Sequence, residues 1–307
     1  MIVSNDTISI STESWFIPTD ILMVSCSSIA VLLALFSLFI IIVDKTCHTV
    51  PMLLIANTCI LDLIFGVDMV ASSLFTLQND LKQIYYQDSL CITRGIIGYI
   101  TVFLQNYSFL CQAIYRYIRV IYSNQIYYQS MKFQSLVVFL QYILGFIYVI
   151  PVITIGNVHY HEYNQICQTS LNLSFIMIYN LLCIFAIPSS ITIFIYYHLV
   201  RYVKQINRNS TAANQLNRAK QELTMLRRVV ILNMGVTCIN LPYATMVFIG
   251  YITTPPKYHF RIAYIGLDVS LAFIMLAVFK FTDQFQNFIK KTIFPLRRSN
   301  RIMPSMT

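Results

Sequence analysis

The chain has 307 residues, of which 57% are hydrophobic and only 11% are charged, and its mean hydropathy is +0.65. This composition excludes an ordinary soluble enzyme or nucleic-acid-binding domain, because a surface exposed to water needs more charge. The net charge of +9 therefore indicates membrane orientation and a lipid partner, not a nucleic acid.

Seven stretches are long and apolar enough to cross a bilayer as helices. A hydrocarbon core of about 30 Å needs about 20 helical residues, because lipid offers no partner for backbone N–H and C=O groups. No polar linker or repeat divides the chain, so we predict an all-α integral membrane protein, a seven-helix transmembrane bundle over residues 20–281. The predicted spans are 20–43, 51–77, 91–122, 133–155, 173–202, 222–252 and 260–281.

The basic residues are distributed unequally between the two sides of the predicted bundle. Of the 21 Lys and Arg residues, only four fall on the side of the N-terminus. Because basic residues accumulate on the cytoplasmic side, we predict an extracellular N-terminus, a cytoplasmic C-terminus and a place in the plasma membrane. The four outer basic residues are Lys82, Arg94, Lys257 and Arg261.

Three segments outside the spans have predicted forms. Residues 1–19 are polar and are expected to form an extracellular tail. The polar, basic stretch 207–221 is interpreted as a short third cytoplasmic loop that joins two helix extensions. In residues 282–307, apolar side chains at three- and four-residue spacing from Phe285 predict a short amphipathic eighth helix on the membrane, followed by a cytoplasmic tail.

The third span carries the most specific motif. Residues 113–120 read A-I-Y-R-Y-I-R-V, with Arg116 placed 25 residues after Cys91, and residues 57–63 of the second span read N-T-C-I-L-D-L. These features resemble the A-x-D-R-Y-x-x-V and N-L-A-x-A-D-L motifs of the rhodopsin-like (class A) G protein-coupled receptors, with the chain a divergent orphan member. An ionisable group in lipid costs about 2.5 kcal/mol or more, so Asp62 is expected either to be functional or to order helix packing.

The resemblance implies a latch at the cytoplasmic end of the bundle. In the family, the Arg at position 116 contacts the G protein in the active state and is held by a carboxylate of the sixth helix in the inactive state. Glu222, twenty residues before Pro242, can supply that carboxylate, or it can pair with basic neighbours on its own helix. Tyr115 replaces the usual acid, which predicts a partly freed Arg116 and higher basal activity, and Tyr117 completes the motif.

Two proline-bearing spans resemble the moving helices of the family. Pro188 resembles the helix-distorting proline of the fifth helix, and Tyr196 matches the tyrosine that swings inward on activation. The run C-I-N-L-P-Y around Asn240 and Pro242 resembles C-W-L-P-Y, with Asn240 in place of the Trp switch. A proline removes a ladder hydrogen bond and lets a helix bend. Phe279 keeps the aromatic of the N-P-x-x-Y motif. The resemblance implies an activation core made of Asp62, Pro188, Asn240, Pro242 and Phe279.

Two cysteines lie on the predicted outer surface, where an oxidising exterior permits a disulfide. In the family such a bridge ties the second outer loop over the ligand cavity, and the resemblance implies it for Cys91 and Cys167, with two free thiols as the alternative. Sequons at Asn5 and Asn172 are predicted glycosylation sites. A His-x-His pair in the same loop lacks a four-ligand set, so no metal and no other cofactor is predicted.

The ligand is the least determined part of the prediction. By alignment to Arg116, amine receptors of the family carry Asp at the position of Gly98, and the retinal-binding Lys position falls near Val269. The resemblance therefore implies neither ligand and favours a peptide or a chemosensory small molecule. Arg94 is expected to attract an anion or to reach lipid headgroups. The predicted pocket residues, whose aromatics could equally serve helix packing, are Arg94, Gly98, Tyr99, Val102, Tyr243, Val247, Tyr251, Tyr264 and Asp268.

The predicted function is ligand-controlled activation of a heterotrimeric G protein. The alternative is a multi-span transporter or ion channel, which should show a chain of intramembrane charges or repeated halves, and the sequence has neither pattern. No Ser-His, Cys-His or metal constellation suggests an enzyme. The expected partners are an extracellular ligand, a G protein and membrane lipid.

Overall fold

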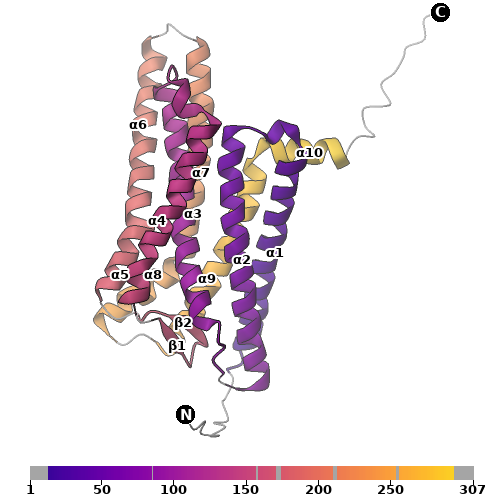
Figure 1. Cartoon of the computed structure of the whole chain (residues 1–307), viewed down its shortest axis with the longest axis vertical. Helices are drawn as coiled ribbons and strands as arrows, with labels where there is room; N and C mark the ends of the chain where they lie inside the picture. Colours follow the sequence, from indigo (N-terminus) through magenta and orange to yellow (C-terminus); the bar gives the residue numbers. More distant parts are fainter. Residues whose placement is uncertain are drawn as a thin grey trace, which may run out of the picture.

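The computed structural model describes residues 13–84, 86–156, 158–170, 174–209, 213–253 and 256–293 as a bundle of long helices (Figure 1). Two short strands lie at one end of the bundle, together with the start of α1, and α10 lies at the other end. We call these the strand end and the α10 end. The elements in chain order are α1 (Phe16–Val43), η1 (Lys45–Cys47), α2 (Val50–Lys82), α3 (Cys91–Ile121), η2 (Ile126–Gln129), α4 (Met131–Thr154), β1 (His159–His161), β2 (Ile166–Gln168), α5 (Phe175–Asn180), η3 (Leu181–Ala186), α6 (Ile187–Asn209), α7 (Ala213–Ile239), α8 (Leu241–Ile252), α9 (His259–Phe281) and α10 (Asp283–Ile293).

The predicted seven-helix bundle is confirmed. By length and composition, α1, α2, α4, the continuous rod Phe175–Ile206 and α9 could each cross a membrane, and α7 with α8 makes a sixth, bent span. The seventh member, α3, is more polar because it lies inside the bundle, where it packs on α2, α4, α6 and α7. Its interior amides meet protein and not lipid, so it needs no continuous apolar surface.

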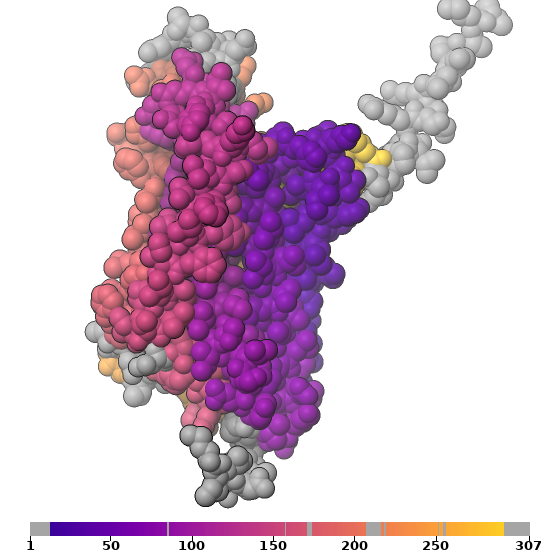
Figure 2. Space-filling view, viewed as in Figure 1, coloured from indigo at the N-terminus to yellow at the C-terminus, as the bar shows by residue number. Residues whose placement is uncertain are grey.

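The outward surface of the bundle is apolar. Leu32 of α1 is 66% exposed, and Phe139 and Phe146 of α4 are 61% and 63% exposed. Figure 2 shows this side of the molecule, with α1 and α2 in indigo and violet beside α4 in magenta. Exposing apolar side chains of this kind to water costs about 25 cal/mol per Å² of apolar surface, so a hydrocarbon environment fits this surface.

The prediction of a loop over 207–221 was wrong for most of its length. α6 continues to Asn209, and α7 begins at Ala213 and runs through Glu222. The reason is local preference: this stretch contains Ala, Gln, Leu and Lys, which form helix readily once tertiary packing supports it. α1 also begins before its predicted start, and α2 ends after its predicted end.

The fifth span contains a wide turn next to its proline. η3 is a π-helical segment placed between α5 and α6, and Pro188 is the second residue of α6. A proline has no N–H to donate, and a π-turn absorbs the resulting mismatch in the hydrogen-bond ladder. The hydroxyl of Thr192 donates to the Pro188 carbonyl at 2.8 Å. The expected distortion at Pro188 is therefore present.

The sixth span breaks at Asn240. The residue separates α7 from α8, and the two segments are bent by 49°. Pro242 stands at the start of α8, where its missing N–H removes a bond to the preceding turn. Both the backbone N–H and the side-chain amide of Asn240 donate to the Val236 carbonyl, at 3.0 and 2.9 Å. The predicted proline kink is thus seen, with Asn240 at its centre.

The predicted eighth helix is confirmed as α10. Its Phe285 is fully buried beside Ile40 and Met52, and Lys290 and Lys291 lie in its last turn. This burial fixes the helix across the α10 end of the bundle (Figure 1).

Candidate functional site

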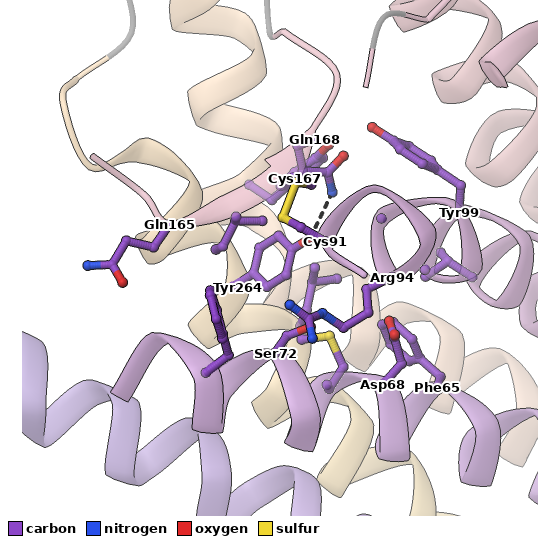
Figure 3. A pocket seen from close by; sticks show the side chains of 18 of the residues that line it. Phe65, Asp68, Ser72, Cys91, Arg94, Tyr99, Gln165, Cys167, Gln168 and Tyr264 are labelled. Carbon is purple, nitrogen blue, oxygen red and sulfur yellow. Dashed lines mark hydrogen bonds between the residues drawn. A yellow bond between two sulfur atoms is a disulfide. The ribbon is translucent and has the colours of Figure 1, made fainter. Parts of the chain in front are cut away.

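A cavity that opens to solvent lies at the strand end, between α2, α3, β2, η3, α8 and α9, with about 840 Å³ of unfilled space that includes part of its mouth (Figure 3). The described residues that line it are Phe65, Asp68, Met69, Ser72, Phe75, Cys91, Arg94, Gly95, Gly98, Tyr99, Val102, Gln165, Ile166, Cys167, Gln168, Ile184, Phe185, Asn240, Tyr243, Tyr264 and Leu267.

Strand β2 covers this cavity and is joined to α3 by a disulfide. Cys91 and Cys167 are bonded, with their Cα atoms 5.5 Å apart, so the expected pairing is confirmed. β1 and β2 form an antiparallel hairpin, where the sequence had predicted only a loop. Gly95 allows the close approach of α3, because a Cβ at that position would lie 2.6 Å from the Cys167 carbonyl oxygen.

Hydrogen bonds also hold the hairpin against the helices. The hydroxyls of Tyr99 and Thr169 lie 2.6 Å apart, and the side-chain amide of Gln168 donates to the Tyr264 hydroxyl at 3.0 Å. Two predicted pocket tyrosines therefore support the cover of the cavity as well as its wall.

Most of the predicted pocket residues line the cavity. Asp268 does not line it: the residue is fully buried, and neither of its carboxylate oxygens has a hydrogen-bond partner among the described residues. On α9, Tyr264 and Leu267 line the cavity, whereas Asp268, one turn after Tyr264, is not among the lining residues. Val247 packs in the core beside Phe260, and the side chain of Tyr251 lies outside the described part. The residues that do line it are Arg94, Gly98, Tyr99, Val102, Tyr243 and Tyr264.

Arg94 has a carboxylate partner within the chain. Its guanidinium lies 2.7 Å from Asp88, in the segment before α3, and stacks over the Phe75 ring at 5.2 Å. An anionic ligand would therefore compete with Asp88 for Arg94. Asp68, which the sequence analysis had not assigned to the pocket, is the other charged residue among the described lining residues.

A cleft of about 890 Å³ lies at the α10 end, with Arg116, Arg119 and Glu222 among its lining residues. A carboxylate oxygen of Glu222 lies 3.4 Å from Arg116, and the other lies 2.9 Å from Arg119. The two ion pairs join α3 to α7. Among the described side chains Glu222 thus pairs across the helices and not along its own helix, and Arg119 is a partner that the sequence did not predict.

The tyrosines around Arg116 are packed into the bundle. Tyr115 is only 5% exposed, and Tyr117 lies edge to face with His198 of α6 at 5.6 Å. Tyr196 packs with Tyr117 in the apolar cluster between α3, α6 and α7. The predicted roles of Tyr115, Tyr117 and Tyr196 in coupling remain predictions.

The residues of the predicted activation core do not all lie together: Asp62 and Phe279 have different surroundings. Asp62 is fully buried and accepts a hydrogen bond from the Gln105 amide, while its second oxygen has no partner among the described residues. Phe279 lies far along α9, where its ring makes a tilted contact with Phe36 of α1 and stacks on Phe285 of α10. Its surroundings connect it to α10 and not to Asp62.

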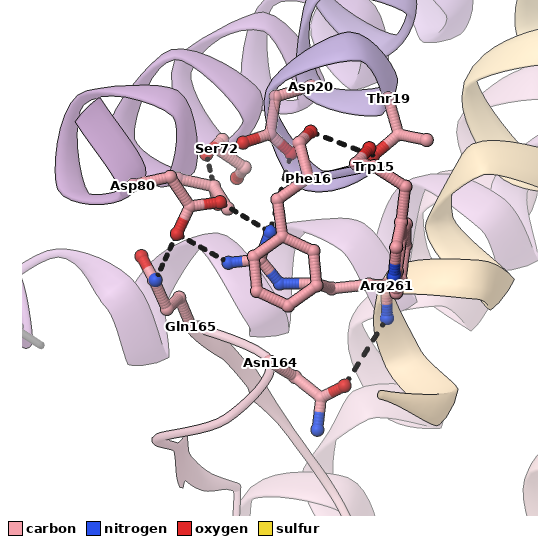
Figure 4. A network of polar contacts seen from close by, with 10 residues as sticks. Trp15, Phe16, Thr19, Asp20, Ser72, Asp80, Asn164, Gln165 and Arg261 are labelled. Carbon is pink, nitrogen blue, oxygen red and sulfur yellow. Dashed lines mark hydrogen bonds and ion pairs between the residues drawn. The ribbon is translucent and has the colours of Figure 1, made fainter. Parts of the chain in front are cut away.

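A buried charge network at the strand end was missed by the sequence analysis (Figure 4). Arg261 of α9 is 1% exposed and makes two hydrogen bonds to Asp80 of α2, at 2.5 and 2.9 Å. It also lies 3.7 Å from Asp20 of α1 and stacks on Phe16 at 4.0 Å. Gln165 donates to Asp80 at 2.6 Å and lines the cavity as well. The signal in the sequence was the position of these charges at the ends of apolar spans.

The histidines of the hairpin do not form a metal site in the described part of the chain, where no group of three or more metal-binding side chains gathers. Burial, and then the neighbouring His159, lowers the pKa of His161 to about 4. Its ring is therefore neutral at physiological pH. Both predicted glycosylation sites, Asn5 and Asn172, lie outside the described residues.

Comparison with known proteins identifies the family. Residues 34–278 match the 7 transmembrane receptor (rhodopsin family), which is well over half of the chain. The chain belongs to this family. Among solved structures, the rhodopsin-family fold of squid rhodopsin matches with a TM-score of 0.72 at 15% identity, over 99% of this chain and 93% of that one. No curated protein matches the sequence.

Membership of the rhodopsin family makes the chain a multi-pass membrane receptor and not an enzyme. The transporter and channel alternatives find no support in the fold or in the charge pattern. The low identity to squid rhodopsin establishes the fold alone and carries no ligand to this receptor.

Proposed function

We propose that this receptor converts binding of an extracellular ligand in the strand-end cavity into activation of a heterotrimeric G protein at the α10 end. The observation that carries the proposal is the ion pair between Arg116 and Glu222, because it joins α3 to α7 below a hinge. An agonist would stabilise the minor conformation in which this pair is open.

The proposed orientation follows from the same arrangement. We expect the strand end, with its disulfide, to face the oxidising exterior of the plasma membrane, and the basic α10 end to face the cytoplasm. Residues 1–19 would then form an outer tail, and residues after 282 an inner helix and tail. Peptides and chemosensory small molecules are the proposed ligand classes.

G protein activation in cells expressing the receptor tests the proposal without a known ligand. Glu222→Ala should raise basal activation, because it releases Arg116, whereas Arg116→Ala should lower or abolish it. Surface amounts should be matched between variants. If neither substitution changes coupling in a receptor that signals and reaches the surface, the latch is refuted.

A further inference from the structure

The cavity contains a carboxylate that the rest of the protein leaves without a close partner. Asp68 lines the cavity from α2, and no hydrogen bond or ion pair of its side chain occurs among the described residues. Its neighbours on the cavity wall include Phe65, one turn before it, and Ser72, one turn after it (Figure 3). A half-buried carboxylate that faces open space is an unused acceptor for a positive charge.

The opposite wall leaves room beside this carboxylate. Gly98 of α3 faces Asp68, and a Cβ at Gly98 would meet only one atom within 4 Å, the Asp68 Oδ2 at 3.9 Å. The glycine therefore keeps the space in front of the carboxylate empty. An Asp at position 98 is absent, but a carboxylate reaches the same space from α2.

The charge balance of the cavity favours a cation. Arg94, the other charged residue of the described lining, interacts electrostatically with Asp68 but has its close ion pair with Asp88, at 2.7 Å. One cation is thus shared between two carboxylates, and Asp68 is the one of the two that lines the cavity. Aromatic rings such as Phe65 and Tyr264 add faces on which a cation is also favoured. An anion would instead lie close to Asp68 and would have to displace Asp88 from Arg94.

We propose that the cavity binds a small organic ammonium ligand, with Asp68 as its counter-ion and the apolar wall around its hydrocarbon part. This rests on the proposed function only in taking this cavity as the ligand site. The glycine at position 98 had argued against an amine ligand. The proposal reverses that expectation, because Asp68 of α2 supplies the carboxylate instead.

The test measures the electrostatic preference of the cavity with small covalent probes. A Gly98→Cys variant is purified with Asp68 intact and with Asp68→Asn. The introduced thiol is reacted with cationic 2-aminoethyl, anionic 2-sulfonatoethyl and neutral methyl methanethiosulfonate, and the parent protein gives the background of the native cysteines. The neutral reagent corrects for any change in thiol reactivity. Ser72→Cys serves as a second position should Gly98→Cys fold poorly, and Asp68→Ser replaces Asp68→Asn in the same case.

The corrected ratio of cation to anion rates should fall about tenfold or more when Asp68 is neutralised, because a unit charge lies next to the thiol. An Asn124→Cys thiol, exposed in the turn after α3, should show no such fall. A fall of less than about threefold at both cavity positions, or no access of the neutral reagent to either, overturns the proposal. The readout involves no G protein, so failure of coupling and failure of the cation site are separate results.

Discussion

Glu222 of α7 is shared by two arginines of α3, at 2.9 Å from Arg119 and 3.4 Å from Arg116. Arg119 thus takes part in the restraint of the sixth span while Arg116 is the residue proposed to engage the G protein. The two contributions can be separated by substitution.

Arg119→Ala should raise basal G protein activation a few fold, and less than Glu222→Ala does. The removed pair is partly exposed, with Arg119 33% accessible, so about 0.5 to 1 kcal/mol is expected. Coupling itself should survive, because Arg116 remains. A matched comparison is Arg201→Ala on the exposed face of α6, whose guanidinium stacks on Tyr197 and which should leave basal activity unchanged. Basal activity of Arg119→Ala equal to wild type would remove Arg119 from the latch.

Arg261→Met should strongly reduce thermal stability and surface amount. It leaves the buried Asp80 and Asp20 without their cation, which typically costs about 3 to 5 kcal/mol. Thermal unfolding of the purified receptor measures the effect. Adding Asp80→Asn and Asp20→Asn should restore part of the loss, because no buried charge then stands alone.

Arg94→Met provides the comparison for this network. Its partner Asp88 lies at the exposed surface, so a much smaller loss of thermal stability is expected. Equal losses in Arg94→Met and Arg261→Met would contradict the view that burial makes the Arg261 network the stronger support.

Cys91→Ser and Cys167→Ser should impair folding to the same degree, and the double variant should be no worse than either. Both remove one bond that closes a separation of 76 residues, worth up to about 4 kcal/mol in the chain-entropy account. Surface labelling and thermal unfolding give the measurement, with Cys238→Ser, exposed on α7, as the control. Unequal losses would mean that one cysteine has a second role.

The hairpin should become less stable in acid because of His161. Its folded pKa is about 4, against 6.5 for an exposed imidazole. As the pH falls from 6.5 towards 4, the unfolded chain binds a proton that the folded chain excludes, so stability is lost in that window. His161→Gln should flatten the pH dependence of the thermal stability of the purified receptor between these limits. His159→Gln, at an exposed position, should flatten it only in part, because it removes the lesser of the two causes that lower the His161 pKa. An unchanged slope in His161→Gln would assign the acid sensitivity elsewhere.

The sequence predicted the membrane crossings from apolar length, and the resemblance to the family predicted the pair between Arg116 and Glu222. Apolar length determines which segments enter lipid, and the separation of Arg116, Glu222 and Pro242 along helices determines which side chains reach one end of the bundle. The disulfide was also expected, because two cysteines lie on the predicted outer side and the resemblance implies a bridge between them.

Features set by packing between distant segments were not predictable. The Arg261 network needs the ends of α1, α2 and α9 to meet, and no local pattern states that. The misplacement of Asp268 came from the rotation of α9, because one helical step decides between the cavity and the core. Asp68 of α2 was overlooked because its proposed role depends on a contact with another helix: it faces Gly98 of α3.

Asn240 lies in the wall of the cavity and also at the 49° bend between α7 and α8. A molecule seated there would touch the pivot itself, with no bulky aromatic relay in between. Small changes in how that molecule contacts one amide would then be enlarged along the length of α7, so closely related ligands could differ more in efficacy than in affinity.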